Sequence, residues 1–218
     1  MKSILTFSAF LFLATSVFSQ NFRENQYSID FRKSSSKETA GKVLGNLYIN
    51  EDFSVATISN YDKNTPLRYN PYKDEMEFMK GDAIYYLNKH EGISVDFKSE
   101  GKVYVIRKHK YELKYFVLAQ KGELSFLVKE RVKFIAATQA VDSYGSSKAA
   151  RYSRSRDEFY FANKHGKILS LPKKKKQLIK LFSGHNSGVK SFIKKNKINP
   201  KKQKDLVKLF KFLNESKS

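Results

Sequence analysis

The chain contains no cysteine, and this single absence excludes several kinds of chemistry. Without thiols there can be no disulfide, no thiolate metal ligand and no cysteine nucleophile. The lipid-bearing cysteine of a lipoprotein is excluded for the same reason. Tryptophan is also absent, but eighteen Phe and thirteen Tyr can supply a core, so global disorder is not expected.

Short catalytic and metal-binding motifs are also missing. The four histidines form no His-x-His or H-E-x-x-H pattern. No G-x-S-x-G sequence is present, so the nucleophile elbow of serine hydrolases is absent. We therefore expect no metal site, no cofactor and no catalytic residue, because the sequence contains no complete catalytic motif.

The longest apolar run lies at the amino terminus and is too short to span a membrane. Lys2 precedes fifteen residues, Ile4–Phe18, that are apolar except for Thr and Ser at a few positions. A spanning helix needs about 20 residues, so a transmembrane anchor is the weaker interpretation. The pattern predicts a signal peptide over residues 1–19, cleaved between Ser19 and Gln20. The mature chain would then be exported, to the periplasm or the extracellular space, without an integral membrane span.

Acidic side chains are few, and the charge is unevenly distributed. Against 42 Lys and Arg stand 21 Asp and Glu, which gives a net charge of +21. Residues 173–218 hold fifteen lysines but only Asp205 and Glu215, a net charge of +13. A field of this strength attracts anionic partners such as acidic glycans, phosphorylated surface lipids or nucleic acid.

The composition also supports a different origin for this charge. Lys outnumbers Arg thirty-four to eight, and Asn, Ile, Phe and Tyr are frequent too, as AT-rich codon usage produces. Arg is the residue preferred for bidentate recognition of phosphate. Nucleic acid is therefore not an expected partner, while an anionic surface or a small ligand remains open.

From Leu47 onward, apolar residues recur at every second position. Ile93, Val95 and Phe97 alternate with polar residues, and the pattern returns in later segments. Glycine-containing turns separate these runs, and no helical pattern lies between them. We predict an antiparallel β domain over 47–171, with about nine strands in a curved meander or partial barrel.

Two segments do not follow this alternation. Residues 20–46 are predicted to hold a first strand at Tyr27–Phe31 and then an exposed, serine-rich loop. Residues 139–157 are small, polar and basic, and they predict a long loop before a last hairpin. That hairpin would pair Phe159–Phe161 with Ile168–Leu171.

Beyond Pro172 the apolar spacing becomes that of helices. Asn199 is predicted to cap the third of them, with Pro200 at its first position. Residues 172–218 therefore predict a lysine-rich segment of three helices, and the whole chain is predicted to be an α+β protein. The predicted apolar faces are formed by residues 178–182, 189–193 and 206–213.

The densest motif-like string covers residues 66–78 and reads Pro-Leu-Arg-Tyr-Asn-Pro-Tyr-Lys-Asp-Glu-Met-Glu-Phe. Together with Leu-Tyr-Ile-Asn-Glu-Asp-Phe at 47–53, Tyr-Phe-Val-Leu at 115–118 and Gly-Glu-Leu-Ser at 122–125, it resembles exported, β-rich proteins of Bacteroidetes bacteria. The resemblance extends over most of the mature chain. It implies export and a β-rich fold, but no activity, because no function is established for those proteins.

Two interpretations of the polar residues in this string are open. In the first they line a polar site that either binds a glycan or hydrolyses one, since glycosidases use paired carboxylates. In the second, which we favour, the string is a strand–turn–strand in which Arg68 pairs with a carboxylate across the hairpin and the glutamates face water. The residues concerned are Arg68, Tyr69, Asn70, Asp74, Glu75 and Glu77.

A second candidate site is the run of four lysines Lys173, Lys174, Lys175 and Lys176. Beside amphipathic helices, such a run suits docking on an anionic surface. In the alternative, the helices pack their apolar faces inward and simply keep their lysines in water.

The leading hypothesis is a non-catalytic exported protein of the cell envelope with a binding or structural role. One alternative is a carrier that holds an apolar or anionic small ligand in a pocket lined by the sheet. Another is binding to an anionic polymer or a membrane surface through the basic helices.

Overall fold

The computed structural model describes residues 29–34, 43–139 and 147–215. The predicted signal peptide and its cleavage site at Ser19 and Gln20 lie outside these residues. Within them, an eleven-stranded antiparallel sheet is followed by three helices, so the predicted α+β class is confirmed. The sheet strands are β1 (Phe31–Lys33), β2 (Ser54–Ile58), β3 (Thr65–Asn70), β4 (Glu75–Lys80), β5 (Ala83–Leu87), β6 (Ser94–Phe97), β7 (Lys102–His109), β8 (Glu112–Gln120), β9 (Ser125–Lys129), β12 (Glu158–Ala162) and β13 (Ile168–Ser170).

Two meanders share strand β2. The strand order is β1-β5-β4-β3-β2-β6-β7-β8-β9-β12-β13, so β3 to β5 extend from one side of β2 and β6 to β9 from the other. The amino-terminal half of β2 pairs with β3 through Ser54–Ala56, and its last residues, Thr57 and Ile58, pair with β6. The edge strands β1 and β13 do not pair with each other, so the sheet is not closed. The meander was predicted correctly, but the described part of 47–171 holds twelve strands rather than nine.

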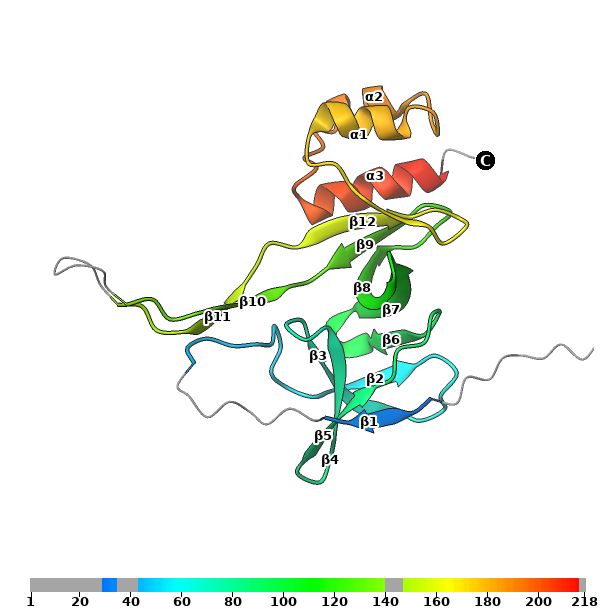
Figure 1. Cartoon of the computed structure of the whole chain (residues 1–218). Coiled ribbons are helices and arrows are strands. Elements are labelled where there is room, and N and C mark those ends of the chain that lie inside the picture. The colour runs from blue at the N-terminus through cyan, green and yellow to red at the C-terminus, as the bar shows by residue number, and fades with distance from the viewer. Residues whose placement is uncertain (1–28, 35–42, 140–146, 216–218) are drawn as a thin grey trace, which may run out of the picture.

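The region predicted as a long loop contains a strand. Strand β10 (Val132–Ile135) pairs with β11 (Arg151–Arg154), and together they form an arm that extends away from the sheet (Figure 1). Thr138 and Lys148 continue the pairing toward the tip. The loop prediction for 139–157 was therefore wrong at its carboxyl end, while residues 140–146 lie outside the described part. The first strand also differs, because β1 begins at Phe31, where the predicted strand ends.

Three helices follow the sheet: α1 (Lys175–Phe182), α2 (Val189–Lys195) and α3 (Gln203–Glu215). The third begins later than predicted. The Asp205 carboxylate accepts the backbone N–H of Asn199 at 2.9 Å, while the Asn199 side chain accepts the N–H of Lys201 at 2.9 Å. Residues 199–202 therefore form a turn ahead of α3 instead of its first turn. None of the helices in the described part is long and apolar enough to cross a bilayer.

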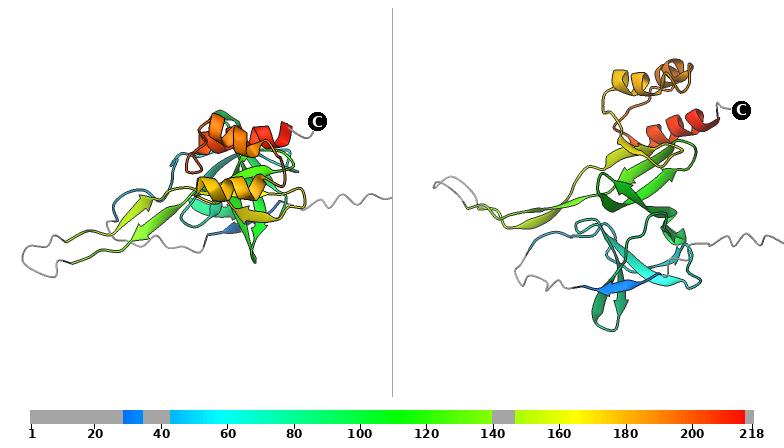
Figure 2. Two further views of the ribbon diagram at one scale, coloured as in Figure 1. Left: turned by 90° about the horizontal axis from the view of Figure 1, so that it is seen from above. Right: turned by 45° about the vertical axis from the view of Figure 1, so that its right-hand side comes forward.

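Helix α3 packs on β8 and β9 at one end of the sheet, with α1 and α2 beyond it and β1 and β3 to β5 at the other end (Figures 1 and 2). Phe210 of α3 stacks on Phe126 of β9, with ring centroids 5.2 Å apart. Phe182 of α1 contacts Phe161 of β12 at 5.3 Å, so the two layers share one hydrophobic core. The inward-facing residues predicted for α3 are fully buried: Leu206, Leu209, Phe210 and Leu213.

Hydrogen bonds to the sheet fix the carboxyl end of α3. The Asn214 amide accepts the backbone N–H of Leu124 and donates to its carbonyl, both at 3.0 Å, as a neighbouring strand would. A Cβ atom added at Gly122 would lie 2.3 Å from the Asn214 side chain, so this turn needs glycine to let α3 approach. The position of the helices on the sheet is therefore specified by polar as well as apolar contacts.

We predict that Phe210→Ala lowers the free energy of unfolding by about 3–5 kcal/mol, because it empties a buried site between helix and sheet. The exposed Tyr111→Ala serves as the control and should change it by less than about 0.5 kcal/mol. Urea unfolding followed by circular dichroism measures both. A Phe210→Ala variant as stable as the control would show that the helices do not share the core of the sheet.

Candidate functional site

The 66–78 string forms the hairpin of β3 and β4 and the turn between them. Pro71 follows β3, and the Asn70 side chain accepts the backbone N–H groups of Tyr72 and Lys73 at 3.1 and 3.0 Å. Asp74 closes the turn at φ 58°, in the left-handed region that Asp tolerates better than most residues. This turn directs the Asp74 side chain away from its own hairpin, toward β8 and β9.

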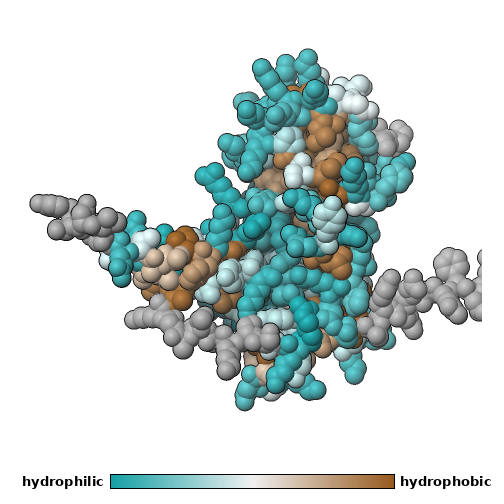
Figure 3. All heavy atoms as spheres, in the orientation of Figure 1, coloured by the Kyte–Doolittle hydropathy of each residue, from teal (hydrophilic) through white to brown (hydrophobic). Residues whose placement is uncertain are grey.

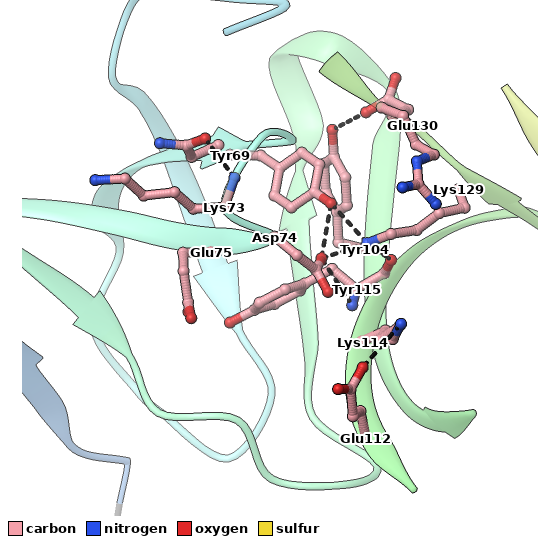
Figure 4. Close-up of polar contacts among 12 residues, drawn as sticks. Tyr69, Lys73, Asp74, Glu75, Tyr104, Glu112, Lys114, Tyr115, Lys129 and Glu130 are labelled. Atoms are coloured by element: carbon pink, nitrogen blue, oxygen red, sulfur yellow. Dashed lines mark hydrogen bonds and ion pairs between the residues drawn. The ribbon is translucent and has the colours of Figure 1, made fainter. Parts of the chain in front are cut away.

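Asp74 meets a buried lysine there (Figure 4). The ammonium group of Lys129, at the end of β9, forms an ion pair with Asp74 Oδ1. It also donates to the Tyr69 hydroxyl and to the Tyr115 carbonyl, both at 3.0 Å. Asp74 Oδ1 accepts the Tyr69 hydroxyl at 2.8 Å and the Tyr115 backbone N–H at 3.3 Å. The network joins the β3–β4 turn to β8 and β9, which belong to the other meander.

Burial governs the protonation of this network. Only 6% of Lys129 is exposed, and desolvation lowers the pKa of its ammonium group to about 8, although Asp74 opposes the shift. Burial likewise raises the pKa of the Tyr69 and Tyr115 hydroxyls well above 10. Both tyrosines therefore remain neutral at physiological pH and serve as hydrogen-bonding and packing groups.

A second polar cluster lies on the opposite face of the same hairpin. Arg68 and Glu77 are cross-strand partners on β3 and β4, and Arg68 Nη2 lies 2.7 Å from Glu77 Oε2. The Tyr48 hydroxyl donates to the same oxygen at 2.8 Å, and Asn70 donates to Glu77 Oε1 at 2.7 Å. Glu77 is only 2% exposed, so its charge is balanced by Arg68 and by neutral donors.

The segment 43–53 covers this cluster. The Arg68 guanidinium lies over the Tyr48 ring, 3.7 Å from its centroid, and 4.3 Å from the Phe53 ring. It also donates to the carbonyl of Glu51 at 2.8 Å. The stacking and hydrogen bonds therefore fix the Arg68 guanidinium in one position.

Glu75 lies beside the Asp74 cluster and shares Lys89 with it, since Lys89 Nζ also lies 3.6 Å from Asp74 Oδ2. Its Oε1 atom forms an ion pair with Arg32 of β1 at 2.6 Å and lies 3.7 Å from Lys89, while Oε2 is buried without a hydrogen-bond partner. Burial raises the pKa of this carboxyl, against the effect of the two cations. The pair with Arg32 attaches β1 to the hairpin.

The six predicted residues thus lie in three places and do not converge on one site. Tyr69 and Asp74 join Lys129, Arg68 and Asn70 surround Glu77, and Glu75 contacts Arg32. The predicted pairing of Arg68 with a carboxylate across the hairpin is present, but the expectation that the glutamates face water was wrong, because 43–53 and β1 cover them. Glu77 accepts hydrogen bonds at both oxygens, from Arg68 and Tyr48 at Oε2 and from Asn70 at Oε1, so its carboxylate links the hairpin to the segment that covers it.

Sequence reasoning missed Lys129, Tyr115 and Tyr48. Lys129 is one lysine among thirty-four, at the end of an apolar run, and no local pattern separates it from a solvated one. The tyrosines follow the alternation of core residues or lie in a loop. Only the pairing of strands distant in sequence brings these side chains to Asp74 and Glu77.

The space between the two meanders is filled by side chains. Tyr69 packs on Tyr104 with centroids 4.6 Å apart, and the cavity beside them measures about 20 Å³, room for about one water molecule. A wider hollow of about 510 Å³ opens on the outer face of the hairpin, beside Lys73, Glu77 and Tyr86. The cavity beside Tyr69 and Tyr104 is therefore too small for an organic ligand.

The four lysines of the second candidate site lie at the entrance to α1, and all are exposed: Lys173, Lys174, Lys175 and Lys176. The apolar face of α1 points the other way, since Leu178 and Phe182 are buried. No group of three or more His, Asp or Glu suited to a metal ion occurs among the residues that the structure describes. Comparisons with protein-family models, curated proteins and solved structures give no significant match to this chain.

We predict that Asp74→Asn lowers the free energy of unfolding by about 3–5 kcal/mol, because it leaves the buried Lys129 ammonium group without its partner. Lys129→Met should cost less, because Asp74 is 20% exposed and keeps Lys89 at 3.6 Å. The double variant should lose less than the sum of the two. Glu112→Gln, which breaks the exposed pair with Lys114, is the control and should cost less than about 1 kcal/mol. Chemical unfolding of the four proteins measures these values, and strict additivity would contradict a direct Asp74–Lys129 interaction.

The pKa of Lys129 also predicts a pH dependence. Its folded value of about 8 lies below the ordinary 10.5, so between these values the unfolded chain binds a proton that the folded chain lacks. The free energy of unfolding therefore contains a contribution that rises with pH in this window. Between pH 8 and 9.5, wild type should gain about 1.5 kcal/mol relative to Lys129→Met. A constant difference across that range would mean that Lys129 keeps its proton and an ordinary pKa.

Proposed function

We propose that the protein is a non-catalytic exported protein of the cell envelope that binds an anionic polymer, such as an acidic polysaccharide, through its lysine cap. The lysine cap denotes residues 173–215, which comprise α1, α2, α3 and their connections. Export rests on the signal-peptide pattern of residues 1–19 and on the resemblance to exported Bacteroidetes proteins. A polymer is favoured because the negative charges spread along it can contact lysines that are spread over a wide surface.

The observation that carries this proposal is the separation of charge and apolar surface in the lysine cap. Its lysines, from Lys173 to Lys211, are all exposed, and within the described residues none of them forms an ion pair. Of the two acids, Asp205 is engaged with the Asn199 backbone. Hydrophilic side chains cover the upper side of the cap in Figure 3. The cations are therefore available to a partner of opposite charge.

The burial of the apolar faces favours a polymer over a lipid bilayer. An interfacial helix binds by inserting its apolar face among the lipids. In the lysine cap that face packs on the sheet, as the full burial of Leu209 and Phe210 shows. A bilayer could then attract the lysine cap only through electrostatic interactions. A flexible polyanion, in contrast, can contact lysines on several sides of the cap.

The polar clusters of the hairpin support the non-catalytic part of the proposal. Asp74 is paired with Lys129, and Glu77 accepts hydrogen bonds at both oxygens. Carboxylates used this way hold strands together and are not free to act on a substrate. A carrier that holds its ligand between the meanders is less well supported, because that space is filled.

We predict that heparin, a soluble acidic polysaccharide, binds the protein with an affinity that falls at least tenfold between about 50 and 200 mM salt. Replacing Lys174, Lys175, Lys176 and Lys180 by Gln should weaken binding and make the salt dependence shallower, since fewer counterions are displaced. The charge-matched control replaces four exposed lysines of the sheet region by Gln, namely Lys63, Lys80, Lys98 and Lys108.

Isothermal titration calorimetry at three salt concentrations measures both variants. Equal losses in the two variants would show that net charge, and not the lysine cap, accounts for binding. Absence of heparin binding together with strong binding to anionic vesicles would move the proposal from a polymer to a membrane surface.

A further inference from the structure

A groove separates the lysine cap from the edge of the sheet, and its lining differs from the rest of the cap. It has a volume of about 500 Å³, within the range of small-molecule sites. The sheet side contributes the β11–β12 connection and the ends of β12 and β13. The helical side contributes the segment before α1 and the turn before α3. Its lining residues are Arg156, Asp157, Phe159, Leu171, Lys173, Pro200, Lys201 and Gln203.

The floor of the groove is apolar and well fixed. Phe159 packs on Phe126 of the core, with centroids 5.5 Å apart. Leu171 donates its backbone N–H to the Phe159 carbonyl at 2.8 Å, which continues the β12–β13 pairing to the floor. Pro200 is buried in the turn that Asp205 stabilises. A preformed apolar floor lets an apolar group bind without ordering the protein first.

The rim of the groove is cationic. Arg156, Lys173 and Lys201 are exposed, and within the described part of the chain none of the three forms an ion pair. The acid in the lining, Asp157, is already bonded by Arg154 at 2.5 Å, and burial raises the pKa of its carboxyl. Gln203 begins α3, so the positive end of that helix dipole also borders the groove.

We propose that this groove binds a small organic anion with an apolar body, such as a medium-chain carboxylate, with the acid group at the cationic rim and the body on Phe159, Leu171 and Pro200. Charge complementarity selects an anion, and the apolar floor selects against a purely polar one. The groove shares Lys173 and Lys201 with the lysine cap, but its apolar floor distinguishes its ligand, since a hydrophilic polyanion gains nothing from that floor.

Titration calorimetry with hexanoate, octanoate and decanoate at about 150 mM salt tests the proposal. Affinity should rise about fourfold with each added methylene until the groove is filled, because each one is removed from water. Nonyltrimethylammonium, with the same nine-carbon alkyl chain and the opposite charge, should bind at least tenfold more weakly than decanoate.

Variants then locate the site. Arg156→Gln combined with Lys201→Gln should weaken decanoate binding at least tenfold. Lys175→Gln combined with Lys176→Gln removes the same charge from the cap outside the groove and should change it less than twofold. Both pairs are exposed, so folding is not at risk.

Equal losses in the two variant pairs would overturn the proposal, because they would indicate nonspecific attraction. So would equal affinity for the cationic amphiphile, or no binding of any carboxylate. Heparin binding tests the lysine cap independently, so either proposal can fail while the other stands.

Discussion

The ion pair between Asp74 and the buried Lys129 is the interaction on which the rest of the structure depends. The chain folds into two meanders that share one strand, β2, and a shared strand alone would leave them free to bend against each other. Asp74 crosses from the first meander to the second, where it finds Lys129, the Tyr115 backbone and, from its own hairpin, the Tyr69 hydroxyl. The cost of burying two charges is offset only when both have further hydrogen-bond partners, and here they do. The tyrosines around the pair fill the space in which a ligand could otherwise lie.

A rigid sheet gives the lysine cap its platform. The helices bury their apolar faces against β9 and β12, and Lys129 is the last residue of β9. The lysines are therefore presented to solvent by a fixed surface, and the groove at its edge has walls from both layers. The hairpin motif thus holds the two meanders together, while the lysines of the cap remain exposed.

The sequence predicted those elements that a local pattern of residues determines. Two-residue alternation predicted strands, and the spacing of Leu206, Leu209 and Phe210 predicted the buried face of α3. Prediction from the sequence failed where contacts with a distant segment determine the structure. Alternation placed Glu77 in water, but residues 43–53 cover it; Asn199 and Pro200 carry a cap signature, but Asp205 takes the Asn199 N–H and delays the helix. Strand β11 was missed because its residues are polar and basic and pair only with segments distant in sequence, namely β10 and Leu44. Lys129 could not be distinguished from its many counterparts without knowing what lies opposite.

The account's central claim is that Asp74 and Lys129 make the two meanders one cooperative unit. Native-state hydrogen exchange compares the opening free energies of amides in β4 with those in β8, under conditions where exchange reports unfolding. The account predicts that in wild type both sets of amides open together, with the free energy of global unfolding. In Asp74→Asn, the amides of β4 should open with a distinctly lower free energy than those of β8. If β4 already opens independently in wild type, the pair does not couple the meanders and the claim is wrong.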